Sequence, residues 1–313
     1  MTTLIIRRLL LAIPLLLIVS FITFFLQSFI PGDPALSLLG PSATPDQLAA
    51  LRAELNLDQP ILTQYGIYLS GLLHGDLGQS IFTGQHVLDS ILERLPVSLS
   101  LIIATTAVSV LIGALLGVIS ATGGPSIARL TDIGSLVGAA LPNFWVGLVL
   151  VSVFAVSLTW LPATGYVPFA ISPEMWGQSL ILPVAALSLG GVATVAKVVR
   201  DGVANAMSME YMRTLRAAGV SRRHLIWKHA LRSSSVTLVT VLGVIFVGAL
   251  SGTVLVENVF VLPGLGSLAV SATARQDLPM IQGVALAFTV ITIIVNLLVD
   301  ISYGLLNPKV RVS

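Results

Sequence analysis

The sequence predicts an all-α integral membrane protein with six transmembrane helices. Of its 313 residues, 55% are hydrophobic and only 10% are charged, whereas a soluble domain carries about a quarter charged residues. A helix needs roughly 20 apolar residues to cross the hydrocarbon core of a bilayer. Stretches without Asp, Glu, Lys or Arg of about this length predict six spans, at residues 9–30, 97–121, 133–158, 178–196, 233–256 and 278–299.

The first stretch is expected to be a retained membrane anchor. It follows Arg7 and Arg8, as the apolar region of a signal peptide follows its basic region, and a signal peptide is the alternative. Its 22 uncharged residues exceed the roughly 7–15 of such a region, and no A-x-A-like cleavage site follows. The run Pro31-Gly32-Asp33-Pro34 then ends the helix, because proline cannot continue a helical backbone.

Residues 31–96 are too many for a simple connector, so we expect a folded helical insertion between the first two spans. Thr44-Pro45-Asp46-Gln47 is typical of a capping box with proline at the first helical position. A second amphipathic helix is predicted over 61–73, where the run Gly75-Asp76-Leu77-Gly78 follows and breaks it. The insertion would either stabilise the helix bundle or dock an external partner. The residues expected to pack are Leu62, Tyr65, Leu69 and Leu72.

Pairs of glycines four residues apart occur in three of the later spans. Lipid tails are as apolar as leucine, so close approach of backbones holds such helices together. The pairs predict helix packing within the chain, with a translocation path or a dimer seam as the alternative. The fourth span is the shortest and is expected to extend around Lys197. The pairs are Gly113 and Gly117, Gly134 and Gly138, and Gly248 and Gly252.

The segment between the fourth and fifth spans is rich in charge. A helix is predicted over 200–218, and Gly219 is placed to end it, because glycine accepts the left-handed conformation at a helix C-terminus. Ser221 can then cap a second short helix. Two short helices around a glycine would form a compact structure that a cytoplasmic partner can push, or a basic surface beside anionic lipids. The second helix carries Arg222, Arg223, His224 and Lys228.

The distribution of basic residues predicts the orientation, because basic loops stay in the cytoplasm. Thirteen of the sixteen Lys and Arg residues lie at the two termini and in the segments that follow the second and fourth spans. Both termini are therefore expected to be cytoplasmic, and residues 31–96 to be outside. The net charge of +2 indicates no nucleic-acid partner.

Several kinds of chemistry have no support in the sequence. There is no cysteine and no G-x-x-x-x-G-K-[ST] loop, and the six predicted spans contain no ionisable residue. Asp300 is expected to cap the sixth helix or to pair with Lys309 or Arg311. We therefore predict no catalytic residue, no metal and no cofactor, and any uphill transport would draw its energy from another chain. The four histidines, in predicted loops without metal-binding spacing, are His74, His86, His224 and His229.

An ordered set of motifs resembles an ABC-transporter permease of the dipeptide/oligopeptide importer family, from the first helix to the C-terminus. The resemblance is to the first of two permeases, the Dpp/Opp B-type subunit, a binding-protein-dependent transport inner-membrane component. The motifs are Pro31-Gly32-Asp33-Pro34-Ala35, Leu57-Asp58-Gln59-Pro60, Gly75-Asp76-Leu77-Gly78 with Ser80, Glu93-Arg94-Leu95-Pro96, Pro142-Asn143-Phe144-Trp145, Leu161-Pro162-Ala163-Thr164-Gly165-Tyr166, Glu257-Asn258-Val259-Phe260 with Pro263-Gly264-Leu265-Gly266, and Asp300 near Asn307-Pro308.

The segment from Glu210 to Gly219 resembles the EAA loop through which such permeases contact their ATPases. Thr214 and Leu215 stand where the general pattern has two alanines. Leu215 is bulkier than alanine. This chain therefore departs from the pattern at a residue that would affect how closely the loop contacts the ATPase. The resemblance implies a coupling role for Glu210, Arg213, Thr214, Leu215, Arg216, Ala217, Ala218, Gly219, Ser221 and His229.

The resemblance also implies a fold, a set of partners and further site residues. The fold would be the MetI-like permease fold of type I ABC importers, with residues 31–96 as an extracytoplasmic insertion, 97–306 as the permease core, a coupling loop at about 198–232 and a cytoplasmic tail at 307–313. The partners would be a homologous second permease, two cytoplasmic ATPases and an extracytoplasmic solute-binding protein.

The cargo would be peptides, with nickel complexes, haem or glutathione as alternatives. A secondary transporter is the alternative of a different class, and a membrane-embedded enzyme lacks a nucleophile and base. Candidate pathway or gate residues are Asn143, Phe144, Trp145 and Glu257; candidate docking residues are Asp58, Gln59, Asp76 and Gly78.

Overall fold

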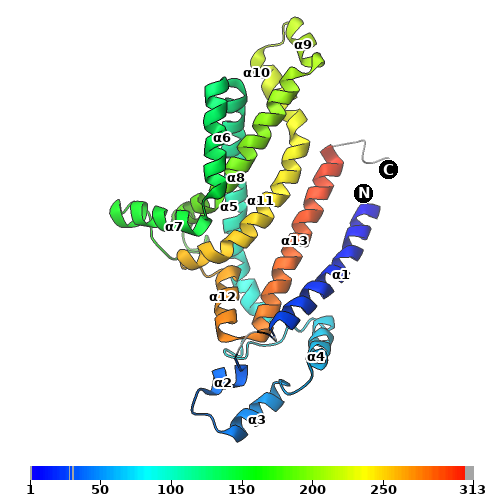
Figure 1. Cartoon of the computed structure of the whole chain (residues 1–313), viewed down its shortest axis with the longest axis vertical. Helices are drawn as coiled ribbons and strands as arrows, with labels where there is room; N and C mark the ends of the chain where they lie inside the picture. Colours follow the sequence, from blue (N-terminus) through cyan, green and yellow to red (C-terminus); the bar gives the residue numbers. More distant parts are fainter. Residues whose placement is uncertain (1, 28, 30–31, 307–313) are drawn as a thin grey trace. The chain divides into compact units, whose positions relative to one another are not determined.

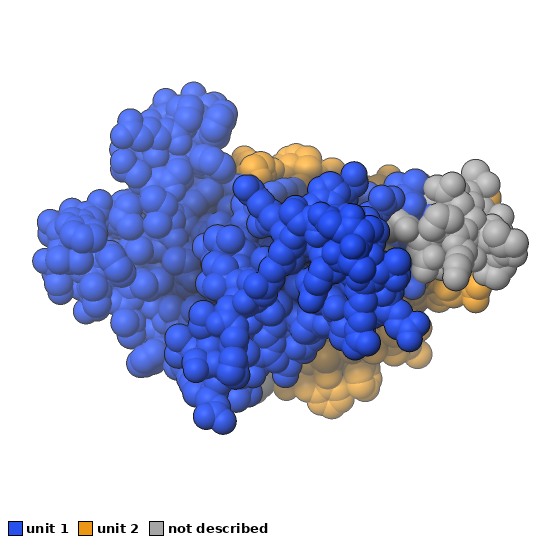
Figure 2. Space-filling model, turned by 90° about the horizontal axis from the view of Figure 1, so that it is seen from above, with its two compact units in different colours: residues 1, 98–262, 294–313 blue, residues 2–97, 263–293 orange. Residues whose placement is uncertain are grey.

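The computed structural model describes residues 2–27, 29 and 32–306. Within these residues the chain is helical without a β-strand, and its extended pairing is an isolated bridge between Gln79 and His86. The all-α prediction is confirmed. The described residues form two compact units (Figure 2): unit 1 holds Ser98–Leu262 and the described residues from Ile294 onward, and unit 2 holds the described residues of Thr2–Val97 and Pro263–Ile293. The predicted tail at 307–313, with Lys309 and Arg311, lies outside the described residues, as does Pro31.

Five helices in the described part of the chain are long and apolar enough to cross a membrane, and they coincide with five of the six predicted spans. Three prolines, Pro14, Pro96 and Pro183, lie inside these helices without ending them. The helices are α1 (Thr2–Gln27), α5 (Val87–Thr122), α8 (Pro173–Ser208), α11 (Leu231–Val259) and α13 (Leu278–Leu306).

The third predicted span is not one straight helix, and this part of the prediction is wrong. Helix α6 (Pro125–Ala140) is followed by α7 (Asn143–Leu150) and the π-helical η1 (Val151–Ser157), and the two parts are bent by 97°. Leu141, between them, has φ −78° and ψ 127°, which is the extended conformation that proline imposes on the residue before it. Counted as one broken span, the pair gives six crossings.

Helices α6 and α8 pack antiparallel within unit 1. Ser135 donates a hydrogen bond to the carbonyl of Ala193 at 3.2 Å, and Arg200 donates to the carbonyl of Ala128 at 3.1 Å. Arg200 also pairs with Asp132 at 2.5 Å. Earlier residues of α6 thus meet later residues of α8. Helix α6 runs back along α8, from the level of Arg200 to the level of Leu189, where Gly138 packs near the bend before α7.

Helix α8 is longer than its predicted span. It extends through Lys197, as expected, and ends only at Ser208. Residues 198–208, which the sequence placed in the coupling loop, are therefore the last turns of a membrane helix. Helix α5 also starts earlier than the predicted second span, at Val87. Residues 87–96, the last part of the predicted insertion, are therefore the first turns of this helix.

The first glycine pair brings α5 and α8 into close contact. A Cβ on Gly113 would lie 2.6 Å from Cβ of Val195, and one on Gly117 would lie 2.6 Å from the carbonyl oxygen of Ala196. The packing reading is therefore confirmed for this pair. Gly134 and Gly248 differ, since a Cβ there would meet no atom within 4 Å.

We expect Gly117→Ala to destabilise unit 1 and Gly248→Ala to leave its stability equal to or slightly above that of the wild type. The first methyl group would strike a backbone carbonyl and push α5 from α8, at a cost of roughly 1–3 kcal/mol. The second enters open space and improves helix propensity. Unfolding titrations of the two variants in mixed micelles check this, and equal stabilities would contradict the packing assigned to Gly117.

Unit 2 contains the two helices that the sequence predicts between the first two spans. Helix α3 (Pro45–Glu54) begins with the capping box, in which Gln47 N donates to Thr44 Oγ1 at 3.3 Å and Thr44 N to Gln47 Oε1 at 3.0 Å. Helix α4 covers Ile61–Leu73 as predicted. The sequence missed two short helices, α2 (Pro34–Leu39) and α12 (Leu265–Arg275).

Two contacts hold the elements of unit 2 together. Tyr65 of α4 packs edge-on against Phe21 of α1, with ring centroids 5.3 Å apart, and its hydroxyl lies 3.0 Å from Oγ of Ser20. Leu62, also expected to pack, is instead 72% exposed. The start of α5 meets the start of α13, where a Cβ on Gly283 would overlap the side chain of Val87. A buried cluster of this unit contains Val87, Ile91, Leu265, Leu268, Ala272, Met280 and Val284.

Candidate coupling site

The predicted coupling segment is a short amphipathic helix at the end of α8. The backbone is extended at Met209, with φ −67° and ψ 148°, and helix α9 (Glu210–Ala217) then starts in a new direction. Met212 on its inner face is fully buried. Within unit 1, Figure 1 shows α9 and α10 together at one end of α8, away from α7. We call residues 209–224 the knob.

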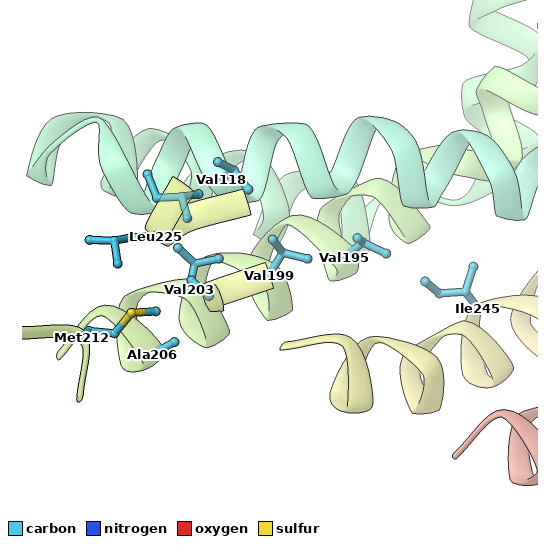
Figure 3. Packing of buried hydrophobic residues seen from close by; sticks show 10 residues of the cluster. Val118, Val195, Val199, Val203, Ala206, Met212, Leu225 and Ile245 are labelled. Carbon is cyan, nitrogen blue, oxygen red and sulfur yellow. The ribbon is translucent and has the colours of Figure 1, made fainter. Parts of the chain in front are cut away.

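The knob rests on a buried apolar cluster that continues into the membrane helices. Figure 3 shows Met212 beside Ala206 and Val203, with Val199 and Val195 following along α8. Side chains from α5, α8, α9, η2 (Leu225–Ala230) and α11 thus share one core, which fixes the knob on the ends of the spans. The buried members are Val118, Val195, Val199, Val203, Ala206, Met212, Leu225, Ile226, Ala230 and Ile245.

Gly219 ends α9 in the way the sequence predicts. Its φ is +83°, and its N–H donates to the carbonyl of Arg216 at 3.1 Å while Val220 N–H donates to that of Leu215 at 3.1 Å. This pair of bonds is a Schellman motif, which satisfies the last free carbonyls of a helix. A Cβ on Gly219 would meet nothing within 4 Å, so the backbone angle, not space, requires glycine.

Ser221 caps the following helix, as predicted, by accepting a hydrogen bond from His224 N at 3.4 Å. That helix is not short, and this part of the prediction is wrong. Helix α10 (Arg222–His224) continues through the π-helical η2 (Leu225–Ala230) into α11, because the residues at both junctions keep right-handed helical angles. His224 and His229 consequently lie in helix rather than loop, with ring centroids 5.8 Å apart.

Most of the predicted coupling residues are exposed on the knob. Leu215, which departs from the alanine of the general pattern, is instead half-buried and packs against the apolar cluster. The larger side chain of Leu215 therefore packs against the core and does not lie on the outer surface of the knob. His229 is also half-buried. The exposed members are Glu210, Arg213, Thr214, Arg216, Ala217, Ala218, Gly219 and Ser221.

Two arginines tie the knob region to neighbouring helices of unit 1. Arg222 donates to the carbonyl of Thr122 at 3.3 Å, which places a positive charge at the C-terminal end of α5, where the helix dipole favours it. Arg200 joins α8 to α6 through Asp132. Beside the knob lies a hollow of about 650 Å³ lined by Ser221, Arg223, His224, Trp227 and Lys228.

The candidate gate residues separate into an exposed and a buried set. Phe144 and Trp145 on α7 are 39% and 49% exposed. Asn143 is half-buried, and its Nδ2 would lie 3.0 Å from a Cβ on Gly252 of α11. Glu257 is completely buried in α11 and accepts a hydrogen bond from Ser98 Oγ at 2.6 Å.

Glu257 lies one residue beyond the predicted fifth span, and helix α11 continues without a break past it to Val259. Asp300 lies one residue beyond the predicted sixth span, and helix α13 continues past it to Leu306. Both carboxyl groups therefore stand at the ends of apolar helices.

The four candidate docking residues lie in unit 2. Asp58 and Gln59 are exposed between α3 and α4. Asp76 accepts a hydrogen bond from Gly78 N at 2.8 Å, and Gly78 has φ +82°, so this pair forms a turn whose structure alone explains the two residue types. Among the described residues no cluster of three or more His, Asp or Glu side chains is arranged to hold a metal ion.

Sequence reasoning missed the anchor of the knob. Met212 and Leu215 stand three residues apart in an otherwise polar helix, which is the spacing of one helix face. That signal was present but short. The burial of Glu257 had no local signal, because the end of an apolar helix is set by its packing partners.

Comparison with known proteins identifies the family. Residues 109–312 match the binding-protein-dependent transport system inner membrane component family, and residues 1–102 match its N-terminal membrane component family. A candidate peptide transport system permease of Brucella abortus strain 2308 is 40% identical over 319 residues, covering 99% of both chains. A candidate peptide ABC transporter permease of Sinorhizobium fredii is 36% identical over 308 residues, or 98% of both.

The glutathione transport system permease protein of Escherichia coli K12 is 37% identical over 308 residues and 98% of both chains. The matches extend over nearly the whole sequence and include both the knob and the helices on which it rests. The chain belongs to the binding-protein-dependent transport system inner membrane component family.

Proposed function

We propose that the chain is the permease subunit of an ATP-driven importer and forms half of a translocation pathway for peptides. The observation that carries the proposal is the knob. It is an exposed helix closed by a Schellman motif at Gly219 and held on the ends of α5, α8 and α11 by one apolar core. A partner that moves this helix would move the spans with it.

Cytoplasmic ATPases are the partners that fit the knob. Its outer face carries Glu210, Arg213 and Arg216, and the adjoining hollow carries Arg223 and Lys228, so both offer polar contacts to a protein surface. Membership of the family implies a transport system with an ATPase and a binding protein. We propose the full complement as two ATPases, a second homologous permease and an extracytoplasmic solute-binding protein.

The orientation follows from the same assignment. If the knob is cytoplasmic, α8 enters the membrane from outside, and both chain termini face the cytoplasm. Residues 31–96 would then form the outer insertion and about 198–232 the coupling region. The exposed Asp58 and Gln59 remain candidates for contact with the binding protein. Asn143, Phe144, Trp145 and Glu257 remain candidates for the pathway or gate.

Peptides are the cargo that the relatives favour, because those of Brucella and Sinorhizobium are named for peptide transport. Glutathione, itself a short peptide, is the second candidate, since the relative from Escherichia coli is named for it. The permease itself would catalyse no reaction, and hydrolysis of ATP would take place in the separate ATPase subunits.

The proposal is tested by purifying the tagged chain in mild detergent and identifying what co-purifies. We expect a homologous permease and one or two Walker-motif ATPases, with an ATPase activity that falls when Arg216 is replaced by alanine. Arg129→Ala is the matched control, because Arg129 is also exposed but lies outside the knob. A lone chain that reconstitutes transport without ATPases, driven by an ion gradient, would overturn the proposal in favour of a secondary transporter.

A further inference from the structure

Unit 2 contains two adjoining cavities of about 500 Å³ and 390 Å³. Both lie within the range of roughly 300–1,000 Å³ typical of small-molecule sites. They share Phe24, Leu57, Gln64 and Leu278 in their walls, so the two cavities lie side by side. Their lining comes from α1, from the insertion helices and from the start of α13.

The walls contain buried polar atoms that have no hydrogen-bond partner among the described residues. In the smaller cavity these are both amide atoms of Gln282, whose side chain is 1% exposed, and the hydroxyl of Tyr68. In the larger cavity it is Nε2 of Gln27, which is 8% exposed. Burial raises the pKa of Tyr68 to about 12, so its hydroxyl remains protonated and can donate.

Buried amides without partners destabilise a fold, and leucine at position 282 would avoid that cost. The amide of Gln282 and the hydroxyl of Tyr68 instead place hydrogen-bond donors and an acceptor beside the apolar side chains of Phe24 and Leu278. An amide side chain pairs with a peptide group through one donor and one acceptor. The charged residues in the wall, Asp33 and Arg52, already bind each other, which leaves the neutral groups to meet a ligand.

We propose that these cavities form a binding site for a short peptide, held through its backbone amides by Gln282, Gln27 and Tyr68. The inference rests on the proposed peptide transport and adds a site in unit 2, outside the candidate gate. Recognition of the main chain, with apolar walls for side chains, suits a site that accepts many sequences.

The test uses the full-length chain in lipid nanodiscs and radiolabelled trialanine as the probe. A second probe is trialanine methylated at both peptide nitrogens, which loses the peptide N–H donors but keeps both carbonyl acceptors. The variants are Gln282→Leu and Tyr68→Phe, with Gln178→Leu as the matched control, because Gln178 is exposed on α8 in unit 1.

We expect Gln282→Leu to weaken trialanine binding about tenfold, Tyr68→Phe to weaken it less, and Gln178→Leu to bind as the wild type does. The methylated probe should bind weakly to the wild type and lose little more in Gln282→Leu. The thermal midpoint of Gln282→Leu should be equal to or above that of the wild type, since leucine removes an unpaired buried amide.

Three results would overturn the site: no binding of trialanine to the wild type, equal binding to Gln282→Leu, or a thermal midpoint that falls clearly in this variant. Uptake by the assembled transporter separates the site from the proposed function. ATP-driven peptide uptake with the same KM in wild type and Gln282→Leu rejects the site alone, whereas a wild-type complex that transports no peptide rejects the function.

Discussion

Replacing Gly219 with proline is expected to abolish ATP-driven transport while leaving the chain in the membrane. Gly219 has φ +83°, whereas proline holds φ near −65°, so the left-handed turn after α9 cannot form. The substitution also removes the N–H that donates to the carbonyl of Arg216. With its Schellman motif lost, α9 would no longer present a fixed surface to the ATPases. Uptake into vesicles and stimulated ATPase activity, measured on the same preparation, check this.

The alanine variants supply the matched comparison. Gly219→Ala keeps the N–H and meets no atom within 4 Å, so its cost is the left-handed angle, roughly 1–2 kcal/mol, and transport should fall only in part. Gly75 ends α4 with the same pair of hydrogen bonds, from Gly75 N–H to the carbonyl of Leu72 and from Asp76 N–H to that of Gly71, and it has φ +79° and equally open surroundings in unit 2. Gly75→Ala should carry the same local strain without affecting coupling to the ATPases. Full uptake by an assembled Gly219→Pro complex would show that transport does not require the knob, and would contradict its proposed role in coupling.

Replacing Glu257 with leucine should give the second large effect, a loss of stability together with a loss of transport. Ser98 and Glu257 are both completely buried, and Ser98 Oγ donates to Glu257 Oε1 at 2.6 Å. Leucine offers no acceptor, so the hydrogen bond from Ser98 is lost, at a cost of roughly 1–3 kcal/mol. Glu257→Gln keeps an acceptor oxygen and should cost less. Unfolding titration in mixed micelles measures both variants.

A double-mutant cycle with Ser98→Ala isolates the hydrogen bond from other effects at Glu257. If the bond contributes to stability, the double variant Ser98→Ala/Glu257→Leu should be more stable than the sum of the single losses predicts. Strict additivity would show that the burial of Glu257, and not its bond to Ser98, determines the loss. Glu174→Gln serves as the control carboxyl, because Glu174 is exposed at the start of α8.

The parts of the fold that the sequence predicts are those set by local chemistry. The capping box at Thr44 and Gln47, the bounds of α4 and the left-handed Gly219 each depend on a few neighbouring residues. Apolar length likewise located five continuous helices that are long enough to span a membrane. These features were predictable because neighbouring residues in the sequence determine them and tertiary contacts change them little.

The bend at Pro142 and the end of α8 were not predictable in the same way. Pro96 and Pro183 lie inside continuous helices, so a proline in an apolar stretch does not say whether the helix will break. At Met209 neither proline nor glycine marks the break between α8 and α9. Packing of Met212 against the apolar cluster decides that geometry, and such tertiary contacts have no short-range pattern.

The continuity of α10, η2 and α11 has a mechanical consequence. From Arg222 to Val259 the helix has no loop, and at 1.5 Å per residue it forms a rod roughly 55 Å long. A continuous helix of this length transmits a tilt applied at one end as a sideways displacement at the other, provided that the π-helical turns at Leu225–Ala230 move with it. A small rotation where Ser221 begins the helix would therefore be amplified along its length, and Glu257, near the far tip, would be the carboxyl group carried farthest by that lever.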